Sequence, residues 1–151
     1  MCRNMPDRSA LRSYPAGLGI LGLGAGVLFV TSIRSFKDLR VWQVSMDLVE
    51  AVYRLSGAFP ADENYGLRGQ IRRAAVSVPS NIAEGHARAS TREYLHHLAM
   101  AQGSLAEVET QLEIAVRLRY LAPEESISCA SDIQKLGKQL HALRNSLEER
   151  R

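Results

Sequence analysis

The chain has 151 residues, 23% of them charged and 6% aromatic, which fits one globular domain with enough aliphatic side chains for a hydrophobic core. Its two cysteines, Cys2 and Cys129, lie far apart without metal-ligand spacing, which excludes a disulfide framework or zinc site and favours a reducing, cytoplasmic setting. The pI of about 9.1 is no evidence for nucleic-acid binding, because four arginines against one aspartate give residues 1–34 the whole net charge of +3 and leave residues 35–151 neutral.

Residues 1–34 differ in pattern from the rest of the chain. The segment from Ala16 to Ile33 is a run of 18 residues without a charge and contains five glycines. Arginines before such a run resemble a signal peptide or a membrane anchor, but the run is short for a bilayer and its glycines make a poor helix. We expect an overextended reading frame with the true start near Val27–Val30; a short anchor and a disordered tail are the alternatives. Residues 1–34 are therefore assigned as a leader and residues 35–151 as the domain.

The first predicted helix spans about Phe36 to Ser56, with Ser35 and Asp38 as a variant capping box and Gly57 at its end. Two apolar stripes run along it at helical spacing. One contains Leu39, Trp42, Met46, Val49 and Tyr53, and the other contains Val41, Val44, Leu48, Val52 and Leu55. Two stripes exceed what one bundle core needs, so we predict burial on two sides, one within the subunit and one against another subunit.

The second predicted helix spans roughly Asp62 to Glu84 and overlaps the segment Gln70–Gly85, QIRRAAVSVPSNIAEG. Its apolar residues Ile71, Ala75, Val78 and Ile82 repeat at helical spacing. Pro79 lacks an N–H and crowds the carbonyl one turn back, which predicts a kink or a break.

Short polar residues around Pro79 form a predicted structural motif. We expect Asn81 to satisfy the backbone that Pro79 releases, and Glu84 to accept a hydrogen bond from Arg73 or Gln70. Gly85 is predicted to be a left-handed helix cap. The motif comprises Gln70, Ser77, Pro79, Asn81, Glu84 and Gly85.

Two further helices complete the prediction. The third begins at Thr91 after a Ser90–Glu93 capping box and continues to Tyr120, and the fourth begins at Pro123. Their apolar seams alternate spacings of four and three: Tyr94, Leu98, Ala101, Leu105, Val108, Leu112 and Ala115, then Cys129, Ile133, Leu136, Leu140, Leu143 and Leu147. Four helices joined by short loops predict an all-α, up-down-up-down four-helix bundle.

The charges of the middle of the chain are uneven. Residues 65–92 hold five arginines against Glu84, whereas residues 93–113 hold four glutamates and no Lys or Arg. Two interpretations are open. The basic and acidic segments complement each other, within a subunit or between subunits. Alternatively, the arginines form a phosphate-binding surface that does not read bases. The candidate nucleic-acid-binding residues are Arg68, Arg72, Arg73, Arg88 and Arg92.

No catalytic or metal site is predicted. Glu93 and His96 match the E-x-x-H motif of di-iron carboxylate bundles, but such a site needs a second motif and two more carboxylates. The possible nucleophiles Ser77, Ser80 and Cys129 have no supporting motif, and phosphate-binding glycine loops are absent. We therefore expect no enzyme activity and no cofactor.

Several motifs together resemble a known family. They are FKDLRVWQ at 36–43, Phe59-Pro60, QIRRAAVSVPSNIAEG at 70–85, Glu93-Tyr94 and Ser104-Leu105. The chain resembles, over about residues 36–121, the bacterial four helix bundle protein family, which includes proteins encoded by intervening sequences within 23S rRNA genes. It is more distantly similar to the accessory variability determinant of diversity-generating retroelements. The resemblance implies a small helical bundle that assembles into a ring, a pentamer.

These observations favour a non-enzymatic homo-oligomer that serves as a scaffold or adaptor. One interpretation adds sequence-nonspecific RNA or DNA binding through the basic second helix, and the alternative is a pure protein-interaction module without a nucleic-acid role. No small-molecule substrate is evident. The dependence on salt concentration should separate the nucleic-acid-binding interpretation from the protein-interaction interpretation. Nucleic-acid affinity falls steeply with salt, whereas a mainly apolar assembly persists.

Overall fold

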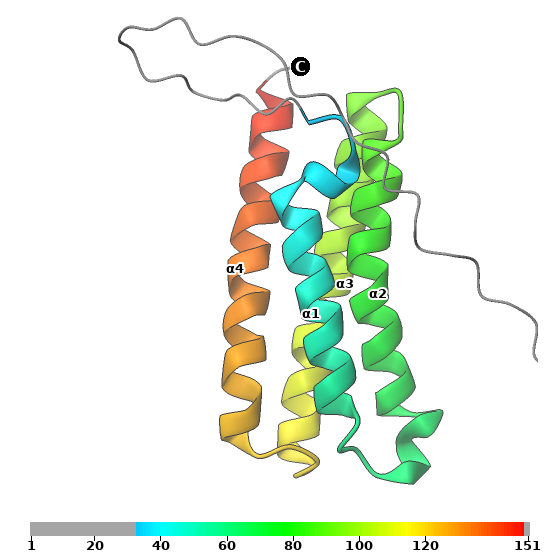
Figure 1. Cartoon of the computed structure of the whole chain (residues 1–151), viewed down its shortest axis with the longest axis vertical. Helices are drawn as coiled ribbons and strands as arrows, with labels where there is room; N and C mark the ends of the chain where they lie inside the picture. Colours follow the sequence, from blue (N-terminus) through cyan, green and yellow to red (C-terminus); the bar gives the residue numbers. More distant parts are fainter. Residues whose placement is uncertain (1–32, 150–151) are drawn as a thin grey trace, which may run out of the picture. The chain divides into compact units, whose positions relative to one another are not determined.

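The structure is a computed structural model, and residues 33–149 are described from it. All but the last two residues of the expected leader lie outside this described part. The described residues form α1 (Arg40–Ser56), α2 (Leu67–His86), α3 (Thr91–Arg117) and α4 (Pro123–Glu148), as Figure 1 shows. Two short 3₁₀ helices, η1 (Phe36–Asp38) and η2 (Ala61–Asn64), precede α1 and α2.

The helices form the predicted all-α, up-down-up-down bundle (Figure 1), and residues 33–149 contain no strand. α1 packs on α2 and α4, and α3 packs on the same two neighbours. Short connections make each helix antiparallel to the one before it. Within the same residues, no helix is long and apolar enough to cross a membrane.

The predicted seams of α3 and α4 form the core. Six of the seven α3 positions are buried, and Tyr94 at the end of the seam is half-buried. On α4 the first four positions, from Cys129 to Leu140, are buried, while Leu143 and Leu147 pack against the core from its edge. The alternating spacing keeps one stripe of each helix turned toward the bundle axis, as in coiled coils.

The first predicted helix is wrong in one respect, because two elements replace it. The Ser35–Asp38 capping box is present, with Asp38 Oδ2 accepting the Ser35 N–H at 2.9 Å, but it caps η1. Leu39 then has an extended backbone and separates η1 from α1. This break turns Leu39 into the core, where only 6% of it is exposed.

The two stripes of α1 have different surroundings. Val41, Leu48 and Val52 lie in the core. Met46 and Tyr53, from the other stripe, are 37% and 44% exposed. Among the described residues, α1 therefore buries most of the stripe that contains Val41 and leaves much of the stripe that contains Met46 uncovered.

The prediction for α2 requires two corrections. Residues from Ala61 to Asn64 form η2, so α2 begins later, at Leu67, whose N–H donates to Glu63 Oε2 at 2.7 Å. α2 then continues through Pro79 without a break. A proline inside a helix costs about 3 kcal/mol, and Pro79 is buried on the side of α2 that faces α1.

The helix ends also differ from the prediction. Gly85 is not a left-handed cap, because α2 continues to His86. α3 ends at Arg117 rather than Tyr120, and Arg119, at φ 60°, has the only positive φ among the non-glycine residues described. The N–H of Arg119 donates to Val116 O and that of Tyr120 to Ala115 O, both at 2.9 Å, which is a Schellman motif.

Candidate functional site

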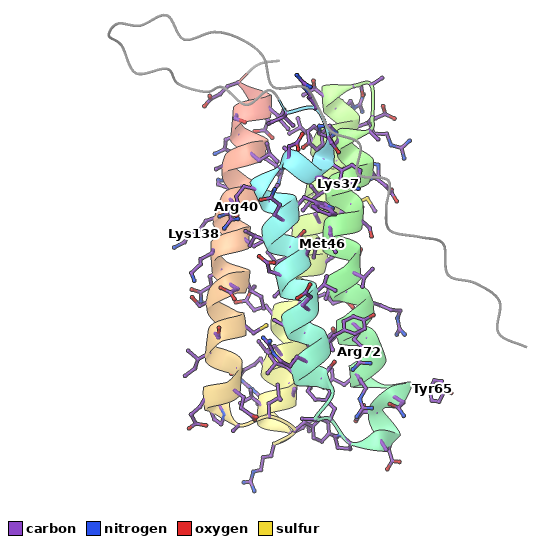
Figure 2. All side chains as sticks on the ribbon, viewed as in Figure 1. Lys37, Arg40, Met46, Tyr65, Arg72 and Lys138 are labelled. Carbon is purple, nitrogen blue, oxygen red and sulfur yellow. The ribbon has the colours of Figure 1, made fainter. Side chains whose placement is uncertain are left out.

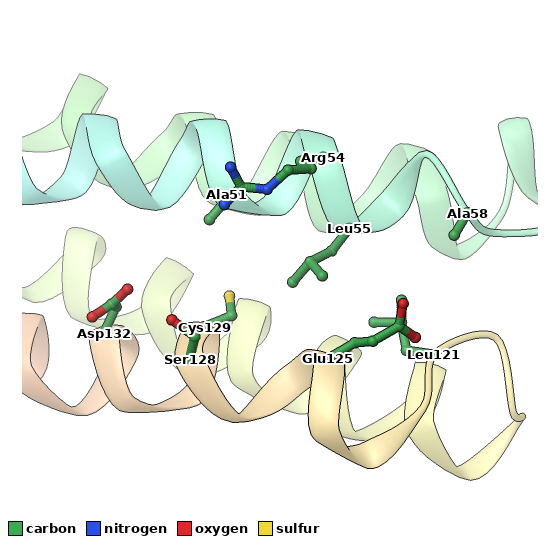
Figure 3. Close-up of a pocket in the computed structure, with 9 residues that line it drawn as sticks. All are labelled: Ala51, Arg54, Leu55, Ala58, Leu121, Glu125, Ser128, Cys129 and Asp132. Carbon is green, nitrogen blue, oxygen red and sulfur yellow. The ribbon is translucent and has the colours of Figure 1, made fainter.

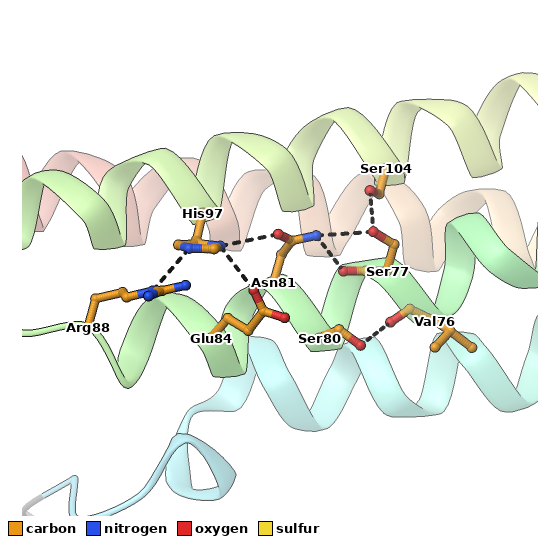
Figure 4. A network of polar contacts seen from close by, with 8 residues as sticks. All are labelled: Val76, Ser77, Ser80, Asn81, Glu84, Arg88, His97 and Ser104. Atoms are coloured by element: carbon orange, nitrogen blue, oxygen red, sulfur yellow. Dashed lines mark hydrogen bonds and ion pairs between the residues drawn. The ribbon is translucent and has the colours of Figure 1, made fainter.

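A chain of polar side chains joins α2 to α3 (Figure 4). Ser104 Oγ donates to Ser77 Oγ at 2.9 Å. The Asn81 amide nitrogen donates to Ser77 Oγ at 3.0 Å and to the Ser77 carbonyl at 2.9 Å. Asn81 Oδ1 in turn lies 3.3 Å from His97 Nδ1. These contacts replace apolar packing over more than one turn of both helices.

The direction of the hydrogen bonds in this series of polar side chains follows from the contact at its exposed end, between Arg88 and His97. Arg88 Nε lies 3.3 Å from His97 Nε2, and because a guanidinium can only donate, Nε2 accepts and carries no proton. The contact with Asn81 Oδ1 then has Nδ1 as its donor. Glu84 Oε2 lies 3.7 Å from the same Nδ1. A single pattern of donors and acceptors therefore connects Arg88 to Ser104.

Two expectations for this motif were wrong. The carbonyl that Pro79 leaves without a helical donor belongs to Ala75, whereas Asn81 donates to the carbonyl of Ser77. Glu84 lies beside His97 and forms no hydrogen bond with Arg73 or Gln70. Asn81 and Glu84 lie on the side of α2 that faces α3. Their partners are therefore Ser77, on the same side of α2, and His97 on α3.

Gly85 sets the distance between the two helices at this end. A Cβ atom at Gly85 would lie 2.7 Å from Tyr94 Cδ2 and 2.8 Å from His97 Cβ, both well inside van der Waals contact. Only glycine therefore allows α3 to approach α2 closely enough for His97 to reach Asn81. The aromatic ring of His86 also packs edge-on against that of Tyr94, 6.1 Å between centroids.

None of the side chains considered as nucleophiles is paired with a base. Asn81 separates Ser77 from His97, and Ser80 Oγ donates to its own helix at Val76 O. Cys129 is 2% exposed, and burial first, then the charge of Asp132, raises its pKa to about 11, which suppresses the reactive thiolate.

The E-x-x-H motif lies at the start of α3, away from the bundle axis. Glu93 and His96 are exposed, and Glu93 Oε2 accepts from Ser90 Oγ at 3.0 Å as part of the helix cap. Between residues 33 and 149, no three His, Cys, Asp or Glu side chains are close enough together to hold a metal ion.

Two of the five candidate arginines stabilise the end of α1. Arg68 donates to the carbonyls of Phe59 and Pro60 in the loop after α1. Arg72 donates to Ser56 Oγ at 2.8 Å and lies over the Tyr53 ring, 4.7 Å from its centroid. A cation at the C-terminus of a helix also interacts favourably with the helix dipole. These two arginines therefore have structural partners.

The other three arginines are exposed and divide between two places. Arg73 lies near the start of α2, whereas Arg88 and Arg92 flank the turn to α3. About 21 Å of helix separates Arg72 from His86 at 1.5 Å per residue, so the five arginines do not form one patch. The four ion pairs of the described residues include none between an α2 arginine and an α3 glutamate.

An apolar groove lies between the outer faces of α1 and α2, with a volume of about 260 Å³. Met46 lies between these two helices on the face that Figure 2 presents. Val76 and Met46 on opposite sides of the groove are 41% and 37% exposed. The groove is lined by Trp42, Met46, Val49, Val76, Pro79, Ser80 and Ala83.

Comparison with known families shows what the chain is related to. The model of the 23S rRNA-intervening sequence protein family matches residues 37–142. The chain belongs to this family. The match includes the polar chain, all five arginines and the apolar groove, so each of these features lies in the part that defines membership.

A solved structure supports the fold of this family member. It is a crystal structure of a protein with unknown function from the S23 ribosomal protein family of Bacteroides thetaiotaomicron. The two chains are 23% identical, with a TM-score of 0.64, and the likeness covers 69% of this chain and 97% of the other. At this identity the likeness shows the bundle alone. No curated protein sequence matches the chain.

Sequence reasoning missed His97 and Ser104 as members of the polar chain. They are seven residues apart on α3 and therefore share one face of it. Ser77 and Asn81 similarly share a face of α2. Two short polar stripes on consecutive helices were the available signal, but their register across the contact depends on Gly85.

Proposed function

We propose that this family member is a non-enzymatic scaffold or adaptor that self-associates through the groove between α1 and α2. The observation that carries the proposal is the exposure of Met46 and Val76 at an apolar groove whose polar lining is limited to Ser80. Contiguous exposed apolar surface on a small domain marks an interaction site. In such an assembly, the α1 stripe that contains Met46 packs against another subunit.

A second copy is the occupant that fits the groove best. The outer face of α3 exposes Met100 and Ile114, and between them Gly103 leaves open space above the helix. Near the groove Arg73 has no ion-pair partner within residues 33–149, and Glu109 on α3 has none either. The two faces thus match in apolar character and in charge.

This pairing joins two different faces of the same subunit. Contacts of this kind are heterologous, and they close into a ring when the rotation between copies allows it. The groove and the α3 face therefore support a ring-shaped homo-oligomer, with a pentamer as the expected size from the family resemblance.

Light scattering of the full-length chain tests the assembly. Val76→Glu places a charge in the groove at an exposed position, so the variant should keep its helical circular dichroism and become monomeric. Ile127→Glu, at a 65% exposed apolar site on α4, is the matched control and should remain oligomeric. A monomeric wild-type chain, or an assembly that survives Val76→Glu, would contradict the proposal.

Sequence-nonspecific RNA or DNA binding is the finer part of the proposed function. The exposed arginine Arg92 has no ion-pair partner within residues 33–149, and a ring would repeat it in every subunit. Arg68 and Arg72 are excluded from this surface by their contacts with α1 and its loop.

Fluorescence anisotropy with a mixed RNA pool and duplex DNA tests this part. The wild type should bind at low salt and lose affinity steeply as salt rises. Arg92→Glu should weaken binding without dissociating the assembly, and Arg40→Glu on α1 should have little effect. An oligomer that ignores nucleic acid at low salt would leave the protein-interaction module as the function.

A further inference from the structure

A second cavity lies on the opposite side of α1, between its C-terminal half and the N-terminal half of α4 (Figure 3). Its volume is about 370 Å³. Leu55 and Leu121 supply apolar walls, and Ala51 and Ala58 are too small to fill the space. The cavity is at the lower end of the range for small-ligand sites, which is about 300–1,000 Å³.

Opposite charges face each other across this cavity without pairing. Arg54 extends along α1, and Asp132 points toward it from α4 (Figure 3). They are beyond ion-pair distance, and Arg54 has no hydrogen-bond or ion-pair partner within residues 33–149. Among residues 33–149, Asp132 forms an ion pair only with Lys135, at 3.3 Å in an exposed pair of the kind that contributes little.

The remaining polar groups of the cavity support this arrangement. Glu125 uses one carboxylate oxygen to accept the Ala122 N–H at 2.8 Å and Asp132 uses one to accept from Lys135 at 3.3 Å, so each carboxylate keeps a second oxygen available. The thiol of Cys129 lies in the same wall. Burial raises the pKa of this thiol most, the carboxylate of Asp132 raises it further and the guanidinium of Arg54 lowers it, so both charges lie close enough to act on the thiol.

We propose that the α1–α4 cavity binds a small zwitterion with an apolar body, of the class of a free aliphatic amino acid. The ligand carboxylate accepts hydrogen bonds from the Arg54 guanidinium, and its ammonium group donates to Asp132. Its side chain packs against Leu55 and Leu121. A ligand with both charges neutralises both walls at once, whereas a simple anion would face Asp132 and a simple cation would face Arg54. This site is independent of the groove proposed for self-association.

Calorimetry on the full-length chain tests the site with three probes: L-leucine, isocaproate, which lacks the amino group, and isoamylamine, which lacks the carboxylate. We expect leucine to bind at least about tenfold more tightly than either analogue, because each analogue makes only one of the two charge-assisted contacts. This comparison uses only the wild-type protein and so does not depend on the folding of any variant.

Two substitutions, each of which removes one charge from the cavity, show which residue binds which end of the ligand. Arg54→Met should remove the preference for leucine over isoamylamine, and Asp132→Asn should remove the preference for leucine over isocaproate. Arg119→Met, outside the cavity lining, should keep both preferences. A merely structural role for Arg54 or Asp132 would weaken all three probes equally, so the crossed pattern is specific to direct contact.

The outcomes that overturn the proposal are equally defined. No saturable binding of leucine at millimolar concentration would show that the cavity holds only water. Equal affinity for leucine and both analogues would show a purely apolar pocket. Variants that weaken all probes in parallel would exclude direct charge recognition by Arg54 and Asp132.

Discussion

The two side-by-side helix contacts α2–α3 and α1–α4 use small residues in opposite ways. At the α2–α3 contact, Gly85 lets the helices approach until no room is left for a Cβ atom beside Tyr94, and a polar chain joins the two helices. At the α1–α4 contact, Ala51 and Ala58 leave a cavity of about 370 Å³. The same class of residue therefore produces close packing on one side and an opening on the other.

Connectivity explains the difference. The turn from Ala87 to Ser90 joins α2 directly to α3 and holds their ends together. α1 and α4 are the first and last helices, and no turn between them sets their spacing. The distance between two packed helices depends on the side chains at their contact, and at the α2–α3 contact the connecting turn adds a further constraint. We therefore expect substitutions at the α2–α3 contact to lower the stability more than substitutions at the α1–α4 contact, where the helices can adjust their spacing.

The largest effect is expected from Gly85→Ala. The new Cβ would lie 2.8 Å from His97 Cβ, an atom that cannot move without the backbone of α3, so the helices must separate. We expect a loss of about 3 kcal/mol in the free energy of unfolding, as for an overpacked core. Urea unfolding followed by circular dichroism measures it.

Gly103→Ala is the matched control within α3. A Cβ at that position meets no atom within 4 Å, so the variant should gain about 0.5–1 kcal/mol from helix propensity. Equal responses of the two glycines would mean that the α2–α3 contact is not limited by Gly85.

An intermediate effect is expected from Asn81→Ala. The substitution removes both donors to Ser77 and the acceptor of His97, in a residue that is 8% exposed. We expect a loss of about 2 kcal/mol and a lower melting temperature, because Ser77 and His97 are left partly unpaired. Differential scanning calorimetry provides the measurement.

Ser80→Ala separates this effect from a general loss of side-chain bonds to the helix backbone. Ser80 is exposed and donates only to Val76 O one turn back, so its replacement should change stability by less than about 0.5 kcal/mol. If Asn81→Ala melts at the wild-type temperature, the polar chain contributes nothing to the α2–α3 contact.

The fold was predictable because its signals are local. The seam from Tyr94 to Ala115 and the Ser90 cap depend only on residues within one or two turns, and the structure has both. The Schellman end of α3 at Arg119 was missed because an arginine in the left-handed region carries no compositional signal.

The candidate site was less predictable because it depends on what two helices present to each other. The role of Gly85 appears only once Tyr94 and His97 are known to lie against it. Likewise, the sequence shows Arg68 and Arg72 as helix charges, whereas the end of α1 supplies their partners. Spacing along one helix gives the direction of a side chain and not the identity of its neighbour.

The smallest effect concerns the α1–α4 contact and is a pH dependence at Cys129. Burial raises the pKa of this thiol to about 11 in the folded protein, above its value in an unfolded chain. The stabilisation is therefore complete below about pH 8 and is lost as pH rises through the folded pKa, because the unfolded chain releases its proton first. At pH 10 the loss should be about 1–2 kcal/mol.

Cys129→Ala isolates this contribution from other alkaline groups. Burial also raises the pKa of Tyr94, and a hydrogen bond to Glu63 raises that of Tyr120, but both tyrosines are present in both proteins. The stability difference between wild type and variant should therefore shrink from pH 8 to pH 10. A constant difference would mean that water enters the α1–α4 cavity freely enough to solvate the thiolate, so this contact would be more open than the static packing of Cys129 indicates.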